Sequence, residues 1–360
     1  MDLMRIMALA LRFFGFILNI VPIKNRIAFL SRQSSTLSLD MSLLITELQT
    51  ASNKPDIEVC LSDPETKKKF VFIIKTLEQL YFACTSRVVI VDGYVPSVCI
   101  PKKRKGITVV QIWHALGAIK KFGYQCLDTP AGRTSKSAII GRMHRNYDYV
   151  IAGGPGAIGA FSEAFNYPAE KIIPLGLPRM DYLLDPSPCS KRREKYQIIK
   201  NRYEFLNNGK RTILYAPTLR KGSGYKDWLT TSLKDLAKKY SEEDNFIVMG
   251  HPLDFSFDKE ILNTYPWVHF ISDEKTIDIL EGADIVISDY SAIVFEAGIL
   301  GKKLIFYTPD LEQYSKSPGL NIEPSKITSE YINSYFKGVG FGSTKRIGDF
   351  IMSFLPKNLS

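Results

Sequence analysis

The most distinctive polar run of the chain follows a short apolar stretch at Ile285–Ile287. The apolar stretch predicts a buried strand, and Ser288-Asp289-Tyr290-Ser291 then leads into a predicted helix. A strand that ends in polar side chains and opens a helix directs free N–H groups and the positive dipole end at an anion. Glu296 lies about one and a half turns into the helix, where its carboxylate could reach sugar hydroxyls. An ordinary strand–helix unit with a polar cap gives the same pattern, so this run alone leaves both interpretations open.

Three further sites in the second half carry side chains that suit phosphate. Thr218 and Arg220 follow the predicted strand 212–216 and place a hydroxyl and a guanidinium two residues apart. His251 follows the next predicted strand and could donate to a phosphoryl oxygen. Lys302 comes after the predicted helix, although a lysine there also simply solvates a helix end. Each signal is weak, but together they predict a cleft that binds a diphosphate-containing ligand.

A histidine in the first half has the type and place of a general base. His114 leaves the predicted strand 107–112, and Lys120 and Lys121 follow. Its ordinary pKa lies near neutrality, and the end of a strand would hold it rigidly. A capped core histidine beside Trp113 is the alternative, and it is the commoner fate of a lone histidine. The downstream glycines and paired lysines favour the functional interpretation.

Strands and helices alternate along the chain in two series. The predicted strands are 27–30, 57–61, 87–92, 107–112, 149–152 and 172–175, then 212–216, 246–249, 268–271, 284–287 and 304–307. Helical spans between them predict two parallel, doubly wound α/β domains, 25–185 and 206–345, with a linker helix at 186–205 and a last helix at 346–360. Ligands of such sheets bind beyond the carboxyl ends of the strands, so we expect the cleft between the domains to hold the site.

Composition narrows the class of partner. The 360 residues carry 47 basic and 37 acidic side chains, a net charge of +10, which predicts an anionic partner. The sequence lacks a basic-aromatic repeat and zinc spacing, so nucleic acid is not favoured. It also lacks a P-loop and a nicotinamide fingerprint, and no motif indicates a divalent metal or other cofactor. Five scattered cysteines indicate reduced thiols.

The first 24 residues predict a helix that lies in a membrane interface. This segment is rich in Leu, Ile, Met and Phe, yet its uncharged run is too short to cross a bilayer. It lacks a cleavage site, so we do not expect a signal peptide. Arg5 and Arg12 are seven residues apart and share one helical face, leaving the rest apolar. A helix docked on the protein's own core is the alternative.

Five elements, in order, resemble those of the CDP-glycerol glycerophosphotransferase family of teichoic-acid and capsule enzymes. They are Trp113-His114-Ala115, Pro178-Arg179-Met180-Asp181, Tyr215 to Arg220, His251-Pro252 and Ser288 to Glu296. The likeness spans about residues 25 to 345, and the order and spacing make it specific. It implies a GT-B-like fold of two facing Rossmann-type domains. It also implies peripheral attachment to the cytoplasmic face of the bacterial membrane.

The resemblance implies transfer of glycerol phosphate or ribitol phosphate from a CDP-alditol to a membrane-linked precursor carried on a prenyl diphosphate, with release of CMP. It assigns His114 as the base, with His251 as a second catalytic group. The implied donor-binding residues are Thr218, Arg220, His251, Asp289, Ser291, Glu296 and Lys302, and the implied acceptor-side residues are Lys120, Lys121 and Arg179. Such phosphoryl transfer works by positioning and charge neutralisation and needs no covalent protein intermediate.

Two departures from the family pattern concern the substrates. Ala292 stands where many members have a second serine, and the loop after His114 differs from the commoner one. The acceptor, the donor alditol, and addition of one unit or many therefore stay open. Two other classes also remain: a GT-B glycosyltransferase using a nucleotide-sugar such as a CMP-sugar, and a non-catalytic protein that binds anionic membrane surfaces.

Overall fold

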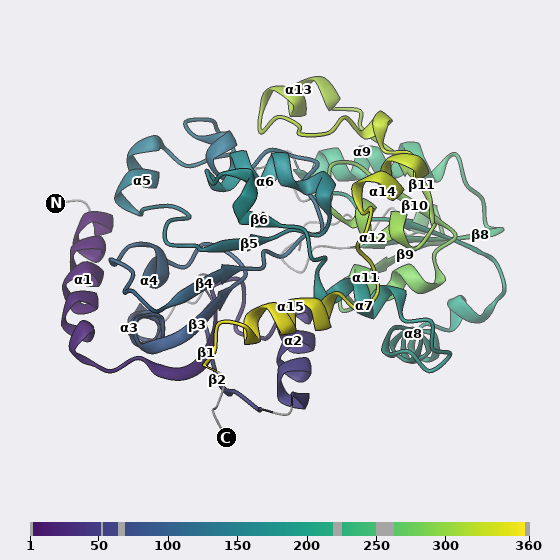
Figure 1. Ribbon diagram of the computed structural model, residues 1–360. Coiled ribbons are helices and arrows are strands. Elements are labelled where there is room, and N and C mark those ends of the chain that lie inside the picture. The colour runs from purple at the N-terminus through teal and green to yellow at the C-terminus, as the bar shows by residue number, and fades with distance from the viewer. Residues whose placement is uncertain (1–2, 52, 64–68, 219–224, 250–262, 357–360) are drawn as a thin grey trace. The chain divides into compact units, whose positions relative to one another are not determined.

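The computed structural model describes residues 3–51, 53–63, 69–218, 225–249 and 263–356, and these residues form two compact units (Figure 1). Unit 1 comprises residues 1–181, 314–321 and 334–360, and unit 2 comprises residues 182–313 and 322–333. The sequence predicts a second domain that ends at residue 345, whereas the described residues from Ser334 onward belong to unit 1.

Unit 1 is built on a six-stranded parallel sheet in the order β2-β1-β3-β4-β5-β6. Its strands are β1 Lys24–Ser31, β2 Asp56–Leu61, β3 Ser86–Val91, β4 Thr108–Gln111, β5 Tyr149–Ile151 and β6 Ile172–Ile173. Its helices are α1 Leu3–Ile17, α2 Leu39–Thr50, α3 Lys69–Thr85, α4 Pro96–Cys99, α5 Ser135–Ile140, α6 Ile158–Phe165 and α15 Ser343–Met352, with α7 Pro178–Leu184 at the boundary to unit 2. The strand order reverses between β1 and β3, so the crevice for a ligand is expected beyond the ends of these two strands.

Unit 2 holds a five-stranded parallel sheet in the order β11-β10-β7-β8-β9. Its strands are β7 Arg211–Tyr215, β8 Asp244–Met249, β9 Val268–Ile271, β10 Ile285–Ser288 and β11 Lys303–Phe306. Its helices are α8 Lys191–Arg202, α9 Tyr225–Ala237, α11 Thr276–Ile279 and α12 Ile293–Ile299, while α13 Leu311–Lys316 and α14 Ser329–Tyr335 end in segments of unit 1. Here the order reverses between β7 and β10.

Alternate residues of the unit 2 strands enter two separate hydrophobic clusters. Ile213, Tyr215 and Ile287 belong to one, whereas Leu214 and Val286 belong to the other. Successive strand residues point to opposite faces, so both faces of the sheet are covered. The predicted parallel, doubly wound sheets are therefore confirmed.

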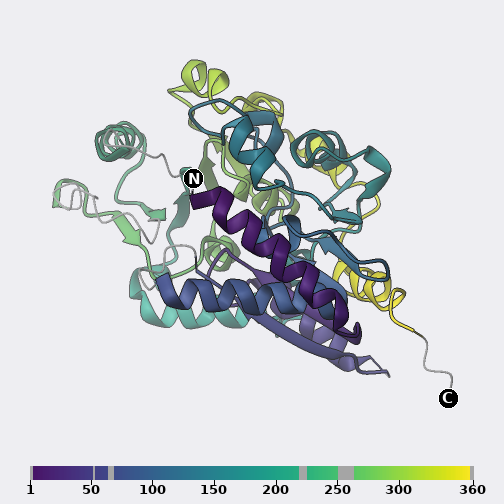
Figure 2. The same ribbon diagram turned by 90° about the vertical axis from the view of Figure 1, so that its left-hand side faces the viewer.

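Helix α1 packs on unit 1 along one side only. Ala8 and Leu11 are buried in a cluster with Leu80 and Cys84 of α3, while Phe16 is 73% exposed. Figure 2 shows α1 lying along this side of unit 1, with α3 beside it. The helix thus has both features considered from the sequence, a docked edge and an exposed apolar face. Among the described residues, no helix has the length and hydropathy needed to cross a membrane.

Candidate functional site

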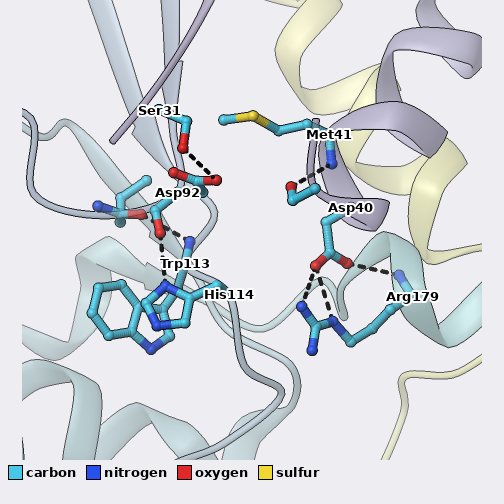
Figure 3. A network of polar contacts seen from close by, with 9 residues as sticks. Ser31, Asp40, Met41, Asp92, Trp113, His114 and Arg179 are labelled. Carbon is cyan, nitrogen blue, oxygen red and sulfur yellow. Dashed lines mark hydrogen bonds and ion pairs between the residues drawn. The ribbon is translucent and has the colours of Figure 1, made fainter. Parts of the chain in front are cut away.

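His114 lies just beyond the carboxyl end of β4, where the chain makes a constrained turn. Trp113 has a left-handed backbone with φ of 53°, which a bulky residue seldom adopts. The side-chain oxygen of Gln111 accepts a hydrogen bond from the Trp113 N–H at 2.8 Å and fixes that turn. The turn directs the His114 imidazole toward the end of β3 (Figure 3). Unusual backbone of this kind concentrates at functional sites.

The hydrogen bond of His114 defines its tautomer. Its Nδ1 lies 2.9 Å from the backbone carbonyl oxygen of Asp92. A carbonyl oxygen only accepts, so Nδ1 carries the proton and the lone pair of the neutral ring is on Nε2. The side chain is exposed. The arrangement provides a proton acceptor that solvent or a substrate hydroxyl can approach.

The surroundings of His114 favour its neutral form. Although solvent reaches the side chain, protein atoms surround much of the imidazole, and the resulting desolvation is the main cause that lowers its pKa. The positive charges of Arg179 and Lys120 lower it further, whereas the Asp92 carbonyl and the charge of Asp40 oppose the shift. A base that remains neutral below the ordinary histidine pKa is ready to accept a proton at neutral pH.

The carboxyl group of Asp92 lies at the reversal of strand order in unit 1. Ser31, the last residue of β1, donates to its Oδ2 at 3.0 Å. Its Oδ1 has no hydrogen-bond partner among the described residues, and the residue is 1% exposed. Burial raises the pKa of Asp92 to about 6, against the opposing effect of the Ser31 hydrogen bond. Asp92, whose backbone carbonyl binds His114, therefore has a carboxyl group with a pKa close to neutral pH.

Arg179 is held by an acid from the first turn of α2. Its Nε donates to Asp40 Oδ2 at 2.9 Å, and its backbone N–H donates to Oδ1 at 2.8 Å. Asp40 is 1% exposed, so this two-point pair is largely shielded from solvent (Figure 3). The guanidinium is thus positioned within electrostatic reach of His114.

Asp181, in the same motif as Arg179, caps the amino end of α15. Its Oδ1 accepts the N–H groups of Gly342 and Ser343, at 2.6 and 3.0 Å, and its Oδ2 accepts that of Thr344 at 2.8 Å. These are the N–H groups that open α15, which lack partners inside the helix. The motif thus ties α7 to α2 and to α15.

The two predicted acceptor-side lysines lie in the loop that follows His114. The backbone of Lys121 donates to Gly319 at 2.9 Å, and Lys120 forms a bridge to Leu320. These contacts pin the loop to residues 314–321 of unit 1. The charge of Lys120 acts on the His114 pKa, so the structure brings His114, Arg179 and Lys120 into one electrostatic neighbourhood.

A second histidine, His144, is a buried core histidine of the kind considered from the sequence as the alternative for His114. His144 is 4% exposed, its Nδ1 lies 3.3 Å from the hydroxyl of Tyr147, and its ring meets Phe165 edge-on. Burial lowers the pKa of His144 to about 3. His144 is the buried histidine of this aromatic cluster, whereas His114 stands at its exposed rim, with its ring 4.0 Å from that of Trp113.

In unit 2, Thr218 and Asp289 meet at the reversal between β7 and β10. Asp289 Oδ1 accepts the Thr218 N–H at 2.8 Å, the Thr218 hydroxyl at 2.7 Å and the Tyr290 N–H at 2.6 Å. Asp289 is fully buried and Thr218 is 7% exposed. Because the Thr218 hydroxyl gives its proton to Asp289, it is not a donor to a phosphate in this arrangement. The pair instead joins the two loops that leave these strands.

Ser291 and Glu296 lie on the same exit of β10. Ser291 is half-buried, and its Oγ accepts the N–H of Ile293 at 3.4 Å, at the start of α12. Glu296, in α12, is 2% exposed. Four predicted donor-binding residues, Thr218, Asp289, Ser291 and Glu296, therefore belong to two adjacent strand exits.

Lys302 lies elsewhere in the sheet. It precedes β11, at the amino edge, whereas Thr218 and Asp289 lie beyond the carboxyl ends of their strands. Its ammonium group donates to the carbonyl of Glu281 at 3.0 Å, and burial lowers its pKa, with the charge of Arg192 acting in the same direction. The structure does not bring Lys302 together with the other predicted donor-binding residues.

Arg220 and His251 lie outside the described residues, so their assigned roles stay predictions. In the part of the chain that the structure describes, no three His, Cys, Asp or Glu side chains gather as metal ligands. Four cysteines are buried, Cys189 is exposed, and all five are free.

The run Gly153-Gly154-Pro155-Gly156 has a packing function. A Cβ at Gly153 would lie 2.2 Å from the carbonyl oxygen of Leu116, and one at Gly154 would lie 2.4 Å from that of Tyr335. Only glycine allows the backbone segments to approach so closely. This run positions the segment after His114.

Sequence reasoning missed Asp40, Asp92 and Ser31. Asp40 acts on a residue 139 positions away, and Ser31 on one 61 positions away. Asp92 had one usable signal, its place as the last residue of a strongly predicted strand. For Asp40 and Ser31, only the folded structure shows which residue each one contacts.

Comparison with known proteins identifies the family to which the chain belongs. The sequence model of CDP-glycerol:poly(glycerophosphate) glycerophosphotransferases matches residues 14–332. A teichoic acid ribitol-phosphate primase of Bacillus spizizenii is 30% identical over 312 residues, covering 79% of this chain and 79% of the relative. A teichoic acid glycerol-phosphate primase of the same organism is 27% identical, covering 80% and 72%.

Solved structures agree on the fold. The wall teichoic acid polymerase TagF aligns with a TM-score of 0.65 at 19% identity, over 92% of this chain and 90% of that chain. This likeness and the two parallel sheets confirm the predicted GT-B-like fold of two Rossmann-type domains. The matched length of the family model and the 30% identical primase together show that the chain is a transferase of the CDP-glycerol:poly(glycerophosphate) glycerophosphotransferase family.

Proposed function

We propose that this transferase moves glycerol phosphate or ribitol phosphate from a CDP-alditol to a teichoic acid or capsule precursor. The tautomer of His114 is the observation that carries the proposal. With Nδ1–H committed to the Asp92 carbonyl, Nε2 is the atom that accepts a proton from the acceptor's terminal hydroxyl. The family's relatives include both glycerol-phosphate and ribitol-phosphate primases, so the donor alditol is part of the proposal's test.

In the proposed reaction, the acceptor oxygen attacks the phosphorus that carries the alditol. The bond from this phosphorus to the CMP oxygen breaks, and the hydroxyl proton moves to His114 Nε2. In-line displacement of this kind depends on positioning and on neutralising the phosphoryl oxygens. In the proposal, Arg220 and His251 supply that charge, and Glu296 binds the cytidine ribose.

On the donor side, we assign Thr218 and Asp289 a positioning role. Their hydrogen bonds link the exits of β7 and β10, and the segment that carries Arg220 begins directly after Thr218. Ser291 then offers a hydroxyl beside this link. We leave Lys302 out of the proposed donor site because its ammonium group donates to Glu281 at the other edge of the sheet.

We propose that the acceptor is a membrane-linked precursor carried on a prenyl diphosphate and that the enzyme acts peripherally at the cytoplasmic membrane face. Support comes from the net charge of +10 and from the exposed apolar side chains of α1. A helix with a docked edge and an apolar outer face suits a membrane interface. Arg179 and Lys120 would attract the phosphates of such an acceptor toward His114.

Replacement of the proposed base tests the mechanism. His114→Ala should reduce turnover about 100- to 10,000-fold, the range that general bases supply. CDP-alditol affinity, measured by calorimetry, should stay within about threefold because the imidazole acts on the acceptor. His144→Gln is the control, since His144 is buried and has no assigned proton to move. Intact turnover in His114→Ala, or lost donor affinity in a folded variant, would exclude this role of His114.

A further inference from the structure

A cavity of about 500 Å³ opens beside the carboxyl end of α1. It is lined by Arg12, Phe16, Asn19, Lys102 and Arg142. The three cations come from three different segments: α1, the turn after α4, and the turn after α5. None of them belongs to the motifs of the transfer site.

Close packing fixes these segments against one another. A Cβ at Gly15 would lie 2.9 Å from that of Pro101, so the glycine lets α1 approach the turn that carries Lys102. Arg104 donates to the carbonyls of Val21 and Cys84, at 2.7 and 3.0 Å, and ties the end of the α1 segment to α3. The cavity walls are therefore held by the fold.

The cations of the cavity lack acidic partners in the part of the chain that the structure describes. Neighbouring Lys103, in contrast, pairs with Asp148. The Arg142 guanidinium donates to the carbonyl of Ile100 at 3.2 Å, which leaves its charge uncompensated. Burial lowers the pKa of Arg142, and the charges of Arg12 and Arg145 lower it further. An anion between these groups would relieve their repulsion.

The cavity lies at the edge of an apolar face. Phe16 lines it and is 73% exposed, and most of the other exposed large hydrophobic side chains belong to α1 and α3: Ile6, Leu9, Phe13, Phe14, Ile17, Phe70, Val71, Ile73, Ile74 and Leu77. Buried Leu11 and Leu80 belong to one hydrophobic cluster, and the two helices lie side by side (Figure 2). Cations beside a bulky apolar surface are the pattern of an interface between water and lipid. A site for a soluble phosphate has no need of that surface.

We propose that this cavity binds the phosphate of an anionic phospholipid headgroup while the outer side chains of α1 and α3 enter the acyl region. Arg12, Lys102 and Arg142 supply the positive charge, and Asn19 supplies an amide donor. The inference extends the proposed membrane attachment and rests on it. It makes attachment selective for phosphate-bearing lipids, beyond attraction to any negative surface.

The test measures partition of the full-length protein onto two kinds of vesicle by co-sedimentation. Both contain digalactosyldiacylglycerol, a neutral bilayer lipid without phosphate, and the anionic component is phosphatidylglycerol in one and oleate, which lacks phosphate, in the other, at matched surface potential. The wild type should prefer phosphatidylglycerol, and R12Q/K102Q should lower the ratio of the two partition coefficients about fivefold or more. R5Q/K105Q removes the same charge outside the cavity lining and should keep the wild-type ratio.

An equal loss on both vesicles, or the same change of ratio in R5Q/K105Q, would overturn the proposal. Soluble glycerol 3-phosphate tests the other source of the same group. If it binds the wild type but not R12Q/K102Q, and the vesicle ratio stays the same, the cavity takes a soluble phosphate and the lipid assignment fails. Transfer from a CDP-alditol to a soluble acceptor, assayed on the wild type, separates the two proposals. Turnover without lipid selectivity defeats only the lipid site, and selectivity without turnover defeats only the proposed reaction.

Discussion

At the scale of single residues, the site in unit 1 is defined by how His114 is held. The left-handed turn at Trp113, the Gln111 hydrogen bond and the Asp92 carbonyl together fix the ring and its tautomer. Desolvation and two nearby cations lower the pKa of the ring. In the proposed reaction, these features prepare Nε2 to accept a proton.

The lowered pKa of His114 predicts the pH dependence of the reaction. A base must be neutral to act, and a lowered pKa keeps it neutral to lower pH. The acidic limb of the kcat/KM–pH profile, which reports the pKa of the free enzyme, should therefore fall below the ordinary histidine value of about 6.5. Lys120→Gln removes a charge that lowers this pKa, so its limb should move toward higher pH. A Lys120→Gln limb that moves to lower pH would contradict the electrostatic account.

Asp92 predicts a pH dependence of stability. Its pKa is about 6 in the fold and 3.8 ordinarily, so the folded state binds the proton more tightly. Its protonated form is compatible with burial, and the free energy of unfolding should fall by about 3 kcal/mol as pH rises from about 4 to 7.

Asp92→Asn should remove this fall of the free energy of unfolding with pH, as measured by urea unfolding curves recorded at several pH values from about 4 to 7. Asp349→Asn is the matched control, because that carboxyl group is exposed and joins only a surface pair with Lys345. Equal slopes in the wild type and Asp92→Asn would show that Asp92 ionises normally in the fold.

At the scale of elements, the strand exits carry the site. In unit 2, Thr218 and Asp289 lie beyond the carboxyl ends of β7 and β10, between which the strand order reverses. In unit 1, His114 follows β4, and its ring contacts the backbone of Asp92 at the end of β3, one of the two strands between which the order reverses. Asp181 shows that the family's motifs also hold elements in place, because it receives the three N–H groups that open α15.

Loss of the Asp181 cap should destabilise unit 1. Asp181→Ala leaves three N–H groups without their acceptor, and we expect a loss of about 2 kcal/mol or more in the free energy of unfolding. Asp349→Ala, later in the same helix, should cost at most about 0.5 kcal/mol. Thermal and urea unfolding of the two variants provide the comparison, and similar losses would contradict the capping role.

The proposed membrane contact of α1 is best tested with point substitutions. Deleting residues 1–24 would uncover Leu80 and Cys84, which pack against Ala8 and Leu11. Phe13→Ser and Phe16→Ser change side chains that are 60% and 73% exposed, so the fold should be retained while vesicle binding weakens at least about threefold each. Ile198→Ser, on exposed α8, is the control. Unchanged sedimentation of both phenylalanine variants would place the membrane contact elsewhere.

At the scale of the whole molecule, sequence patterns predicted two parallel α/β units because short apolar runs, which predict buried strands, alternate with helical spans. His114, Thr218 and Asp289 were also predictable, since each lies within three residues of the end of a strand. The partner of Arg179 was not, because Asp40 is 139 residues away and its own local signal is a helix start. The return of residues 334–360 to unit 1 was equally hidden, since it depends on a tertiary contact with Asp181.

The most direct measurement is release of CMP from CDP-glycerol, CDP-ribitol and CMP-sugars in the presence of a prenyl-diphosphate-linked glycerophosphate acceptor. The wild type should turn over a CDP-alditol, and the preferred one names the donor. His114→Ala should lose that turnover and retain donor binding. Turnover with a sugar nucleotide alone would contradict the proposed reaction and make this protein a glycosyltransferase, in which His114 has no assigned role.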